Sequence, residues 1–579
     1  MKTSQTALAC AFLASAATAG AGEPVPYAHP SSVDGETLTG LVWSPTGVNP
    51  ATSSPRPLVI FLHGGGGNAQ TMLNTANGAF TAELDARGWF GLSPDGRRWG
   101  IATQGCPNEF SFAYVDSDDP DVGPGEQDIL DSLDFAIANY PIDADRIYLA
   151  GFSMGGRGAY IIGLRNPDLF AAIGPMAPAS DMFDTAATVE DPGCLERIVG
   201  GPPLSGERSD TYYSITSARF LIENAYNLPV YHGHGLDDGR AFNREQLAGR
   251  YLHGWHMVND TSWSGCSDGA ALCFGHTPTL SELRDRHPDG YEWAYMFTDR
   301  AHSVDPLWLQ GATPGSGRFG TPDPLAPSQL EGMFDFFERH VLQTNPARVV
   351  FKTYTDQHRR AYWLELDSAT PWRNLPAAAR ATPSPSTNAL TIELARAARV
   401  GIDLARTGLR VAEDAPLTID LQPLADSAYD PNLDVGGLSQ SVTLDLHAAP
   451  ALAETRVLRD GVDLPASSFS RTGDTLTLAN LTLTSRTVLT IGGADVAPTQ
   501  VPDGDSDDTD VPDDDGTGGG GFVLPPDLDS SDTGSDETPL PEPEVTAACG
   551  ARACGAGLAP FWVIGVTGGL LSRLPRRRR

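Results

Sequence analysis

The fold is decided by residues 146–164, RIYLAGFSMGGRGAYIIGL. The apolar run from Arg146 to Ala150 predicts a buried strand, and Gly156 to Leu164 predicts a helix. Between them, GFSMG has the Gly-x-Ser-x-Gly pattern of a tight turn that presents a serine between a strand and a helix. Glycine is needed beside such a serine because neighbouring backbone comes too close for side chains. We therefore predict a nucleophile at Ser153 and not an ordinary glycine-rich turn.

A second glycine-rich segment follows another apolar run. Leu58 to Leu62 predicts a buried strand, and the sequence HGGGG begins directly after it at His63. Glycine lets backbone N–H groups approach a substrate and stabilise a developing oxyanion. We predict that these donors are the N–H groups of Met154 and of Gly64 or Gly65, and that His63 orients the loop. A phosphate-binding loop is disfavoured because the Gly-Lys-Ser/Thr ending is missing.

The remaining members of a catalytic triad are expected in the order acid, then histidine. The sequence LPVYHGHGLDD, residues 228–238, predicts a strand that runs into a loop with two aspartates, and His302 follows the apolar run from Trp293 to Phe297. The predicted set is Ser153 as nucleophile, His302 as base and Asp238 as acid, with Asp237 as the alternative acid. Spacing after the His234-Gly235 turn favours Asp238.

His232 and His234 near these aspartates also allow a zinc site, because alternating residues at a strand end can ligate a metal. A zinc site would leave the serine turn and the glycine loop without a role. We therefore expect no metal and no cofactor.

These segments resemble the α/β-hydrolase family, and within it the secreted esterases that include feruloyl and acetylxylan esterases, polyhydroxybutyrate depolymerases and prolyl-oligopeptidase-like enzymes. Further similarity lies in GEQDIL (125–130), YPIDADRIY (140–148) and NPDLFAA (166–172). The resemblance covers about residues 30–343. It implies an α/β doubly wound, mostly parallel sheet and the same roles for Ser153, His302 and Asp238. Gly239-Arg240-Ala241 stands where the family usually has Val-Pro after the acid, so Asp237 stays open.

The two ends of the chain predict export. Lys2 and the apolar run from Ala7 to Ala19 predict a signal peptide over residues 1–21. The last residues combine Cys549 and Cys554 with a short apolar segment and an arginine cluster, and they resemble bacterial tails recognised by a sorting protease. A plain membrane anchor is the alternative, and we expect membrane contact through this tail only. Both interpretations predict a secreted or cell-surface protein.

Composition and charge divide the remaining chain into segments of different kinds. The formal charge is 39 − 73 = −34, which disfavours nucleic-acid binding. We expect a catalytic domain over residues 22–344, which a helix over Leu330–Leu342 closes. A β-rich, β-sandwich-like and mostly antiparallel accessory module is expected over 345–500, with Thr475–Thr490 as one of its strands. A disordered acidic linker over 501–545 and the tail over 546–579 follow. Four cysteines fall in the folded part, and export permits disulfides in any of three pairings: Cys106, Cys194, Cys266 and Cys273.

The leading hypothesis is a serine esterase that acts through an acyl-enzyme on a polysaccharide-linked ester or a polyester. A peptidase or amidase with the same triad is the alternative, because the triad does not select the bond that is cleaved. A non-catalytic binding protein on a hydrolase fold is a third possibility, which a broken triad would indicate.

Overall fold

The structure is a computed structural model. It describes residues 22–49, 51–64, 67–73, 75–96, 124–178, 217–235, 283–284, 288–298, 329–369, 376–413, 415–424, 440–483 and 485–494. The chain divides into two compact units, Met1–Pro502 and Asp503–Arg579, and all described residues belong to the first. No helix within these ranges is long and apolar enough to cross a membrane.

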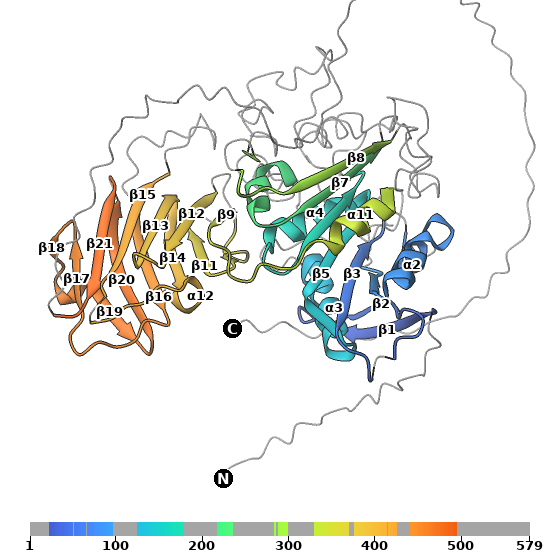
Figure 1. Cartoon of the computed structure of the whole chain (residues 1–579), viewed down its shortest axis with the longest axis horizontal. Helices are drawn as coiled ribbons and strands as arrows, with labels where there is room; N and C mark the ends of the chain where they lie inside the picture. The colour runs from blue at the N-terminus through green and yellow to red at the C-terminus, as the bar shows by residue number, and fades with distance from the viewer. Residues whose placement is uncertain are drawn as a thin grey trace, which may run out of the picture. The chain divides into compact units, whose positions relative to one another are not determined.

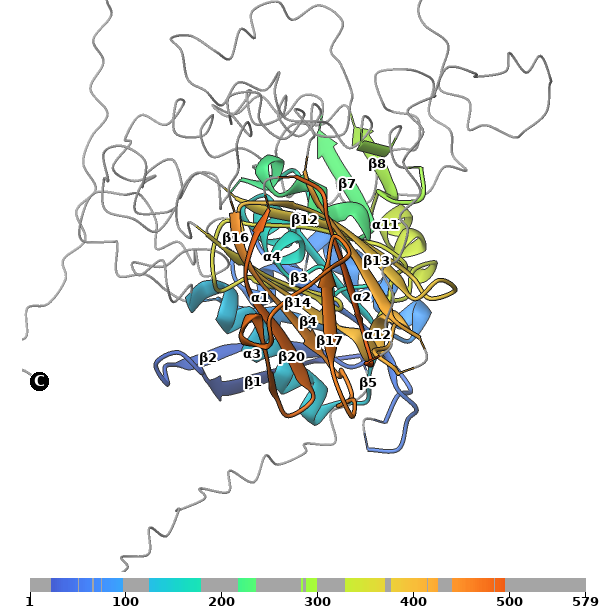
Figure 2. The same cartoon turned by 90° about the vertical axis from the view of Figure 1, so that its left-hand side faces the viewer.

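The first part of the chain forms an eight-stranded sheet from its described residues, with strand order β1-β2-β4-β3-β5-β6-β7-β8 (Figure 1). The strands are β1 (Pro24–Pro30), β2 (Thr37–Trp43), β3 (Arg56–Leu62), β4 (Phe90–Pro94), β5 (Ile142–Phe152), β6 (Ala172–Met176), β7 (Val230–Gly235) and β8 (Trp293–Thr298). β1 and β2 are antiparallel to their neighbours, and β4 to β8 continue as parallel pairs. Figure 2 shows β7 and β8 side by side at one edge. The mostly parallel sheet is as predicted.

Apolar residues on both sides of β3 explain why this sheet is covered on both faces. Leu58, Ile60 and Leu62 belong to one buried cluster, whereas Val59 and Phe61 belong to another. Alternate residues of a strand point to opposite faces, so a continuous apolar strand needs a core on each side. The helices divide accordingly. Those of the first cluster are α3 (Pro124–Asn139) and α4 (Met154–Arg165), and those of the second are α1 (Ala69–Leu73), α2 (Thr75–Arg87) and α11 (Gln329–Glu338). The short helices η2 (Ala218–Phe220) and η3 (Ile222–Tyr226) precede β7.

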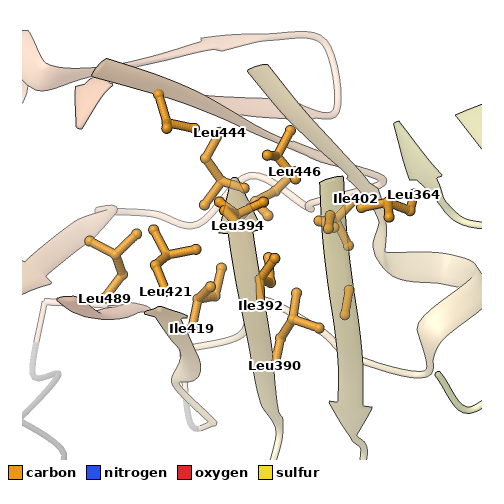
Figure 3. Close-up of a cluster of buried hydrophobic side chains, with 14 of the residues drawn as sticks. Leu364, Leu390, Ile392, Leu394, Ile402, Ile419, Leu421, Leu444, Leu446 and Leu489 are labelled. Carbon is orange, nitrogen blue, oxygen red and sulfur yellow. The ribbon is translucent and has the colours of Figure 1, made fainter. Parts of the chain in front are cut away.

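The later described residues form two further sheets. One has the order β10-β11-β14-β16-β20-β19 and the other β18-β17-β21-β15-β13-β12-β9. Their strands are β9 (Val349–Thr353), β10 (Arg360–Ala361), β11 (Leu364–Ser368), β12 (Ala377–Ser384), β13 (Ala389–Ala395), β14 (Ala397–Asp403), β15 (Leu417–Pro423), β16 (Gln440–His447), β17 (Arg456–Arg459), β18 (Val462–Asp463), β19 (Phe469–Thr472), β20 (Thr475–Leu483) and β21 (Thr487–Gly492), with the short helices α12 (Leu404–Thr407) and η5 (Ala466–Ser468). Side chains from both sheets, such as Leu444 and Ile392, meet in one buried cluster (Figure 3).

Some elements differ from the sequence expectations in detail. The helix expected to reach Leu342 ends at Glu338, and the Leu342 N–H donates instead to the Asp145 carbonyl at 2.8 Å. The single strand expected over Thr475–Thr490 is two strands, β20 and β21, in different sheets. The expected antiparallel pairing also includes two parallel pairs, β13 with β15 and β14 with β16.

Buried polar contacts join the region of the eight-stranded sheet to the region of the two later sheets. The Lys352 ammonium lies 3.1 Å from Glu223 Oε1, and both side chains are almost fully buried. Asn224 accepts from the Lys352 backbone N–H at 2.8 Å, and its amide donates to the Lys352 carbonyl at 2.9 Å. The Tyr362 hydroxyl donates to the Pro167 carbonyl at 2.8 Å. Lys352 and Tyr362, at the two ends of the segment 352–362, are thus both hydrogen-bonded to residues of the eight-stranded-sheet region.

Candidate active site

Ser153 lies on a strained turn between β5 and α4. Its backbone has φ 56° and ψ −113°, a conformation that a residue with a side chain rarely adopts. Two backbone hydrogen bonds hold it there: the Ser153 N–H donates to the Met176 carbonyl at 2.8 Å, and its own carbonyl accepts from the Arg157 N–H at 3.0 Å. The predicted strand, turn and helix are present, and the turn fixes the serine at the carboxyl end of a central strand.

The glycines around Ser153 are required by close packing. A methyl group built on Gly151 would lie 2.2 Å from the Gly155 carbonyl oxygen, and one built on Gly155 would lie 2.1 Å from the Leu62 carbonyl oxygen. Both distances are far below van der Waals contact. Gly155 therefore lets α4 approach the end of β3, where the other glycine-rich segment begins.

The glycine loop after β3 lies beside the serine. A methyl group built on Gly64 would be 3.6 Å from the Ser153 Cβ and 3.2 Å from Phe152 Cδ1. The fully buried His63 ring lies between two carbonyl groups, with Nδ1 2.8 Å from the Gly64 oxygen and Nε2 2.9 Å from the Asp95 oxygen. The structure thus brings together Ser153, Met154, Gly64 and His63 of the predicted site.

The other predicted site residues lie outside the described residues. These are Gly65, Asp237, Asp238 and His302, together with the four cysteines Cys106, Cys194, Cys266 and Cys273. The predicted signal peptide, acidic linker and sorting tail also lie outside them. Their roles stay predictions.

The histidines of the alternative metal site are only partly described. His232 is fully buried on β7, and its Nδ1 lies 2.9 Å from the Tyr160 hydroxyl of α4. Burial strongly raises the pKa of Tyr160, so the phenol stays protonated and can donate to the imidazole. Within the described ranges, no group of three or more His, Cys, Asp or Glu side chains is arranged to hold a metal ion.

A strained serine turn of the Gly-x-Ser-x-Gly type, after a central strand of a mostly parallel sheet, defines an α/β-hydrolase domain. Comparison with known families identifies it further. Residues 43–189 match the family described as "Esterase PHB depolymerase", and residues 131–256 match the family described as "Putative esterase". Residues 43–256 of this chain are thus similar to these esterase families, which confirms the resemblance seen in the sequence.

A curated relative supports the same assignment. Over 177 residues the chain is 31% identical to the poly(3-hydroxybutyrate) depolymerase of Ralstonia pickettii. This alignment covers 29% of the chain and 35% of the relative, so the chain spans about a third of that protein.

Solved structures with a similar outline include two hydrolases. One is an S-formylglutathione hydrolase from Agrobacterium tumefaciens, with 19% identity, a TM-score of 0.34, and coverage of 50% of this chain and 91% of that one. The other is the Pyrococcus horikoshii acylaminoacyl peptidase, with 18% identity, a TM-score of 0.35, and coverage of 55% and 42%.

One contact at the site was not expected from the sequence. Asp95 follows the unpredicted strand β4, and its carbonyl oxygen faces the His63 ring. The apolar run before Ser93-Pro94-Asp95-Gly96 is a signal for a strand and turn, but nothing local shows that the aspartate reaches the glycine loop.

Proposed function

We propose that this protein is an exported carboxylic-ester hydrolase with Ser153 as its nucleophile. The observation that carries the proposal is the strained Ser153 turn packed against Gly64, within a region that matches two esterase families. An esterase needs a serine hydroxyl beside backbone donors, and these two segments supply both. Export rests on the sequence patterns at the two ends of the chain.

The proposed reaction uses the triad predicted from the sequence. Ser153 Oγ attacks the ester carbonyl while His302 accepts its proton, and Asp238 or Asp237 orients His302. The N–H groups of Met154 and of Gly64 or Gly65 stabilise the negative oxygen of the tetrahedral intermediate. The intermediate collapses when the C–O bond to the alcohol breaks and His302 returns the proton to that oxygen. Water then attacks the acyl-enzyme, again with His302 as base, and releases the acid and Ser153.

The position of Met154 supports its role as a donor. Met154 is the first residue of α4, and N–H groups in the first turn of a helix have no partner within the helix. His63 supports the loop in a different way, because its ring is buried between carbonyl groups. A buried ring in this position fits the orientation of the loop better than proton transfer to a substrate.

We propose esters of the polyester or polysaccharide-linked type as the substrate class. The matched depolymerase family and the Ralstonia pickettii relative favour a polyester. The chemistry asks only for an accessible ester carbonyl, so small aryl esters serve as first probes.

The test compares the full chain with four variants on p-nitrophenyl acetate and butyrate, on a poly(3-hydroxybutyrate) suspension and on a peptide anilide. Ser153→Ala and His302→Ala are expected to lower kcat by about 10⁴-fold or more. Of Asp237→Asn and Asp238→Asn, the one that lowers kcat strongly identifies the acid. Hydrolysis that survives in Ser153→Ala would refute the proposal, and Ser153-dependent cleavage of the anilide alone would make the protein an amidase.

A further inference from the structure

We propose that Asp95 is a positioning residue for the glycine loop, the segment between His63 and Ala69. It holds these two ends of the loop and thereby keeps Gly64 beside Ser153. The inference concerns the same site and rests on the ester-hydrolase function proposed above. It follows from hydrogen bonds of a single residue with two separate parts of the loop.

Asp95 contacts the start and the end of the loop with different groups. Its backbone carbonyl lies 2.9 Å from His63 Nε2, at the start of the glycine run. Its side-chain Oδ1 accepts from the Ala69 N–H at 2.9 Å, where the loop passes into α1. Because both bonds come from one residue, His63 and Ala69 cannot move apart without breaking one of them.

Asp95 is itself fixed to the sheet. Its second carboxylate oxygen, Oδ2, accepts from the Thr39 hydroxyl at 2.7 Å, and its N–H donates to the Thr39 carbonyl at 3.0 Å. Thr39 belongs to β2, which pairs with β4, and β4 pairs with β3. The loop therefore takes its position from three neighbouring strands through Asp95.

A fixed loop matters because of where Gly64 lies. Gly64 is packed against Ser153, where a donor has to meet the oxyanion that forms only during the reaction. Such a donor acts in the transition state and contributes little to substrate binding. Loss of its position is expected to lower kcat and leave KM almost unchanged.

The structure offers a matched control in Asp85, an aspartate of α2 that is likewise half-buried. It accepts from the Thr46 N–H at 2.9 Å and from the Thr46 hydroxyl at 3.2 Å, so it too binds one backbone N–H and one threonine. It also accepts from Trp43 Nε1 at 3.1 Å. Asp85→Ala therefore reproduces the loss of an aspartate of this kind away from the glycine loop.

The experiment measures kinetics of p-nitrophenyl butyrate hydrolysis for the full chain, Asp95→Ala, Asp95→Asn and Asp85→Ala. Asp95→Ala is expected to lower kcat by about 10-fold to 100-fold with KM within about two-fold. Affinity for an alkyl boronic acid, which forms a tetrahedral adduct with the serine, should fall by the same factor, whereas affinity for butyrate should not. Asp95→Asn keeps an acceptor for Ala69 and should restore most of kcat. Asp85→Ala should lower Tm but not kcat.

A second measurement does not depend on catalysis. Hydrogen exchange followed by mass spectrometry should show faster exchange in the peptide over residues 63–73 in Asp95→Ala, and unchanged exchange in that peptide in Asp85→Ala. Unchanged exchange in Asp95→Ala, or an equal loss of kcat in both variants, would overturn the inference. Absence of Ser153-dependent hydrolysis in the unmodified chain would refute the proposed function, and the exchange result would still decide whether Asp95 holds the loop.

Discussion

Glu126 allows a test of how much a buried charge stabilises the contact between the eight-stranded-sheet region and the segment after β9. Its carboxylate, in the first turn of α3, is buried and accepts three hydrogen bonds. Arg165 Nη1 and Asn166 Nδ2 donate at 2.6 Å each, and His358 Nε2, beyond the end of β9, donates at 3.0 Å. Glu126→Gln keeps the size of the side chain and removes its charge, which leaves the buried Arg165 and the half-buried His358 without their shared acid.

The size of the effect follows from the pKa of Glu126. Burial alone would raise this pKa, but His358 and Arg165 more than offset burial and lower it from 4.5 to about 2. The difference between a pKa of 4.5 in the unfolded chain and about 2 in the folded one corresponds to roughly 3 kcal/mol of folding stability at neutral pH. The loss of one partner of a buried ion pair typically costs about 3–5 kcal/mol, which agrees. We expect Glu126→Gln to lower the free energy of unfolding by about 3 kcal/mol at pH 7.

The dependence on pH has a definite sign. Because the folded pKa lies below the unfolded one, the ionised carboxylate stabilises the fold above pH 4.5, and this contribution is lost as the pH falls towards 2. The difference between the unmodified chain and Glu126→Gln should therefore shrink to about 1.4 kcal/mol at pH 3. Urea unfolding followed by tryptophan fluorescence at pH 7 and pH 3 measures it.

Asp463→Asn is the matched control. Asp463 accepts from Arg456 at 2.6 and 2.7 Å, and this hydrogen bonding lowers its pKa, but the pair is exposed. Solvent screens such a pair, so no measurable change in stability is expected. A Glu126→Gln effect as small as that of Asp463→Asn, or one that does not change between pH 7 and pH 3, would refute the reasoning.

Three further outcomes are expected. Gly155→Ala should lower Tm and nearly abolish both ester hydrolysis and fluorophosphonate labelling, because its methyl group would lie 2.1 Å from a β3 carbonyl oxygen; labelling at the normal rate would contradict this. A chain ended after residue 344 lacks Lys352 and His358, and circular dichroism and gel filtration should show that it is expanded, whereas a chain that ends at residue 494 should be compact. Tyr160→Phe should lower the free energy of unfolding by about 1–3 kcal/mol in urea denaturation, because the buried His232 Nδ1 loses its hydrogen bond to the Tyr160 hydroxyl. A change of less than about 0.3 kcal/mol would argue against this hydrogen bond.

The parts of the site that the sequence predicts are those that local chemistry determines. The glycines on either side of Ser153 are needed where the chain turns within a few residues, so their spacing shows directly in the sequence. The apolar run of β3 likewise indicates a strand buried on both faces. Contacts that join distant residues leave no such pattern. Asp95 and Ala69 are 26 residues apart, and only the pairing of β4 with β3 brings them together.

The junction between the two regions shows the same limit more clearly. A boundary near residue 345 follows from the change of periodicity in the sequence, and the described elements change there from alternating helices and strands to strands with two short helices. The contacts do not end there, because Glu126 and His358 are 232 residues apart and share a hydrogen bond. An apolar contact tolerates several arrangements, whereas the buried Glu223 carboxylate would lose its ammonium partner without Lys352, and Glu126 would lose one of its two basic partners without His358. The charged pairs therefore favour one arrangement of residues 349–363 against the hydrolase domain, and the hydrolase domain with this segment is the smallest unit that keeps them paired.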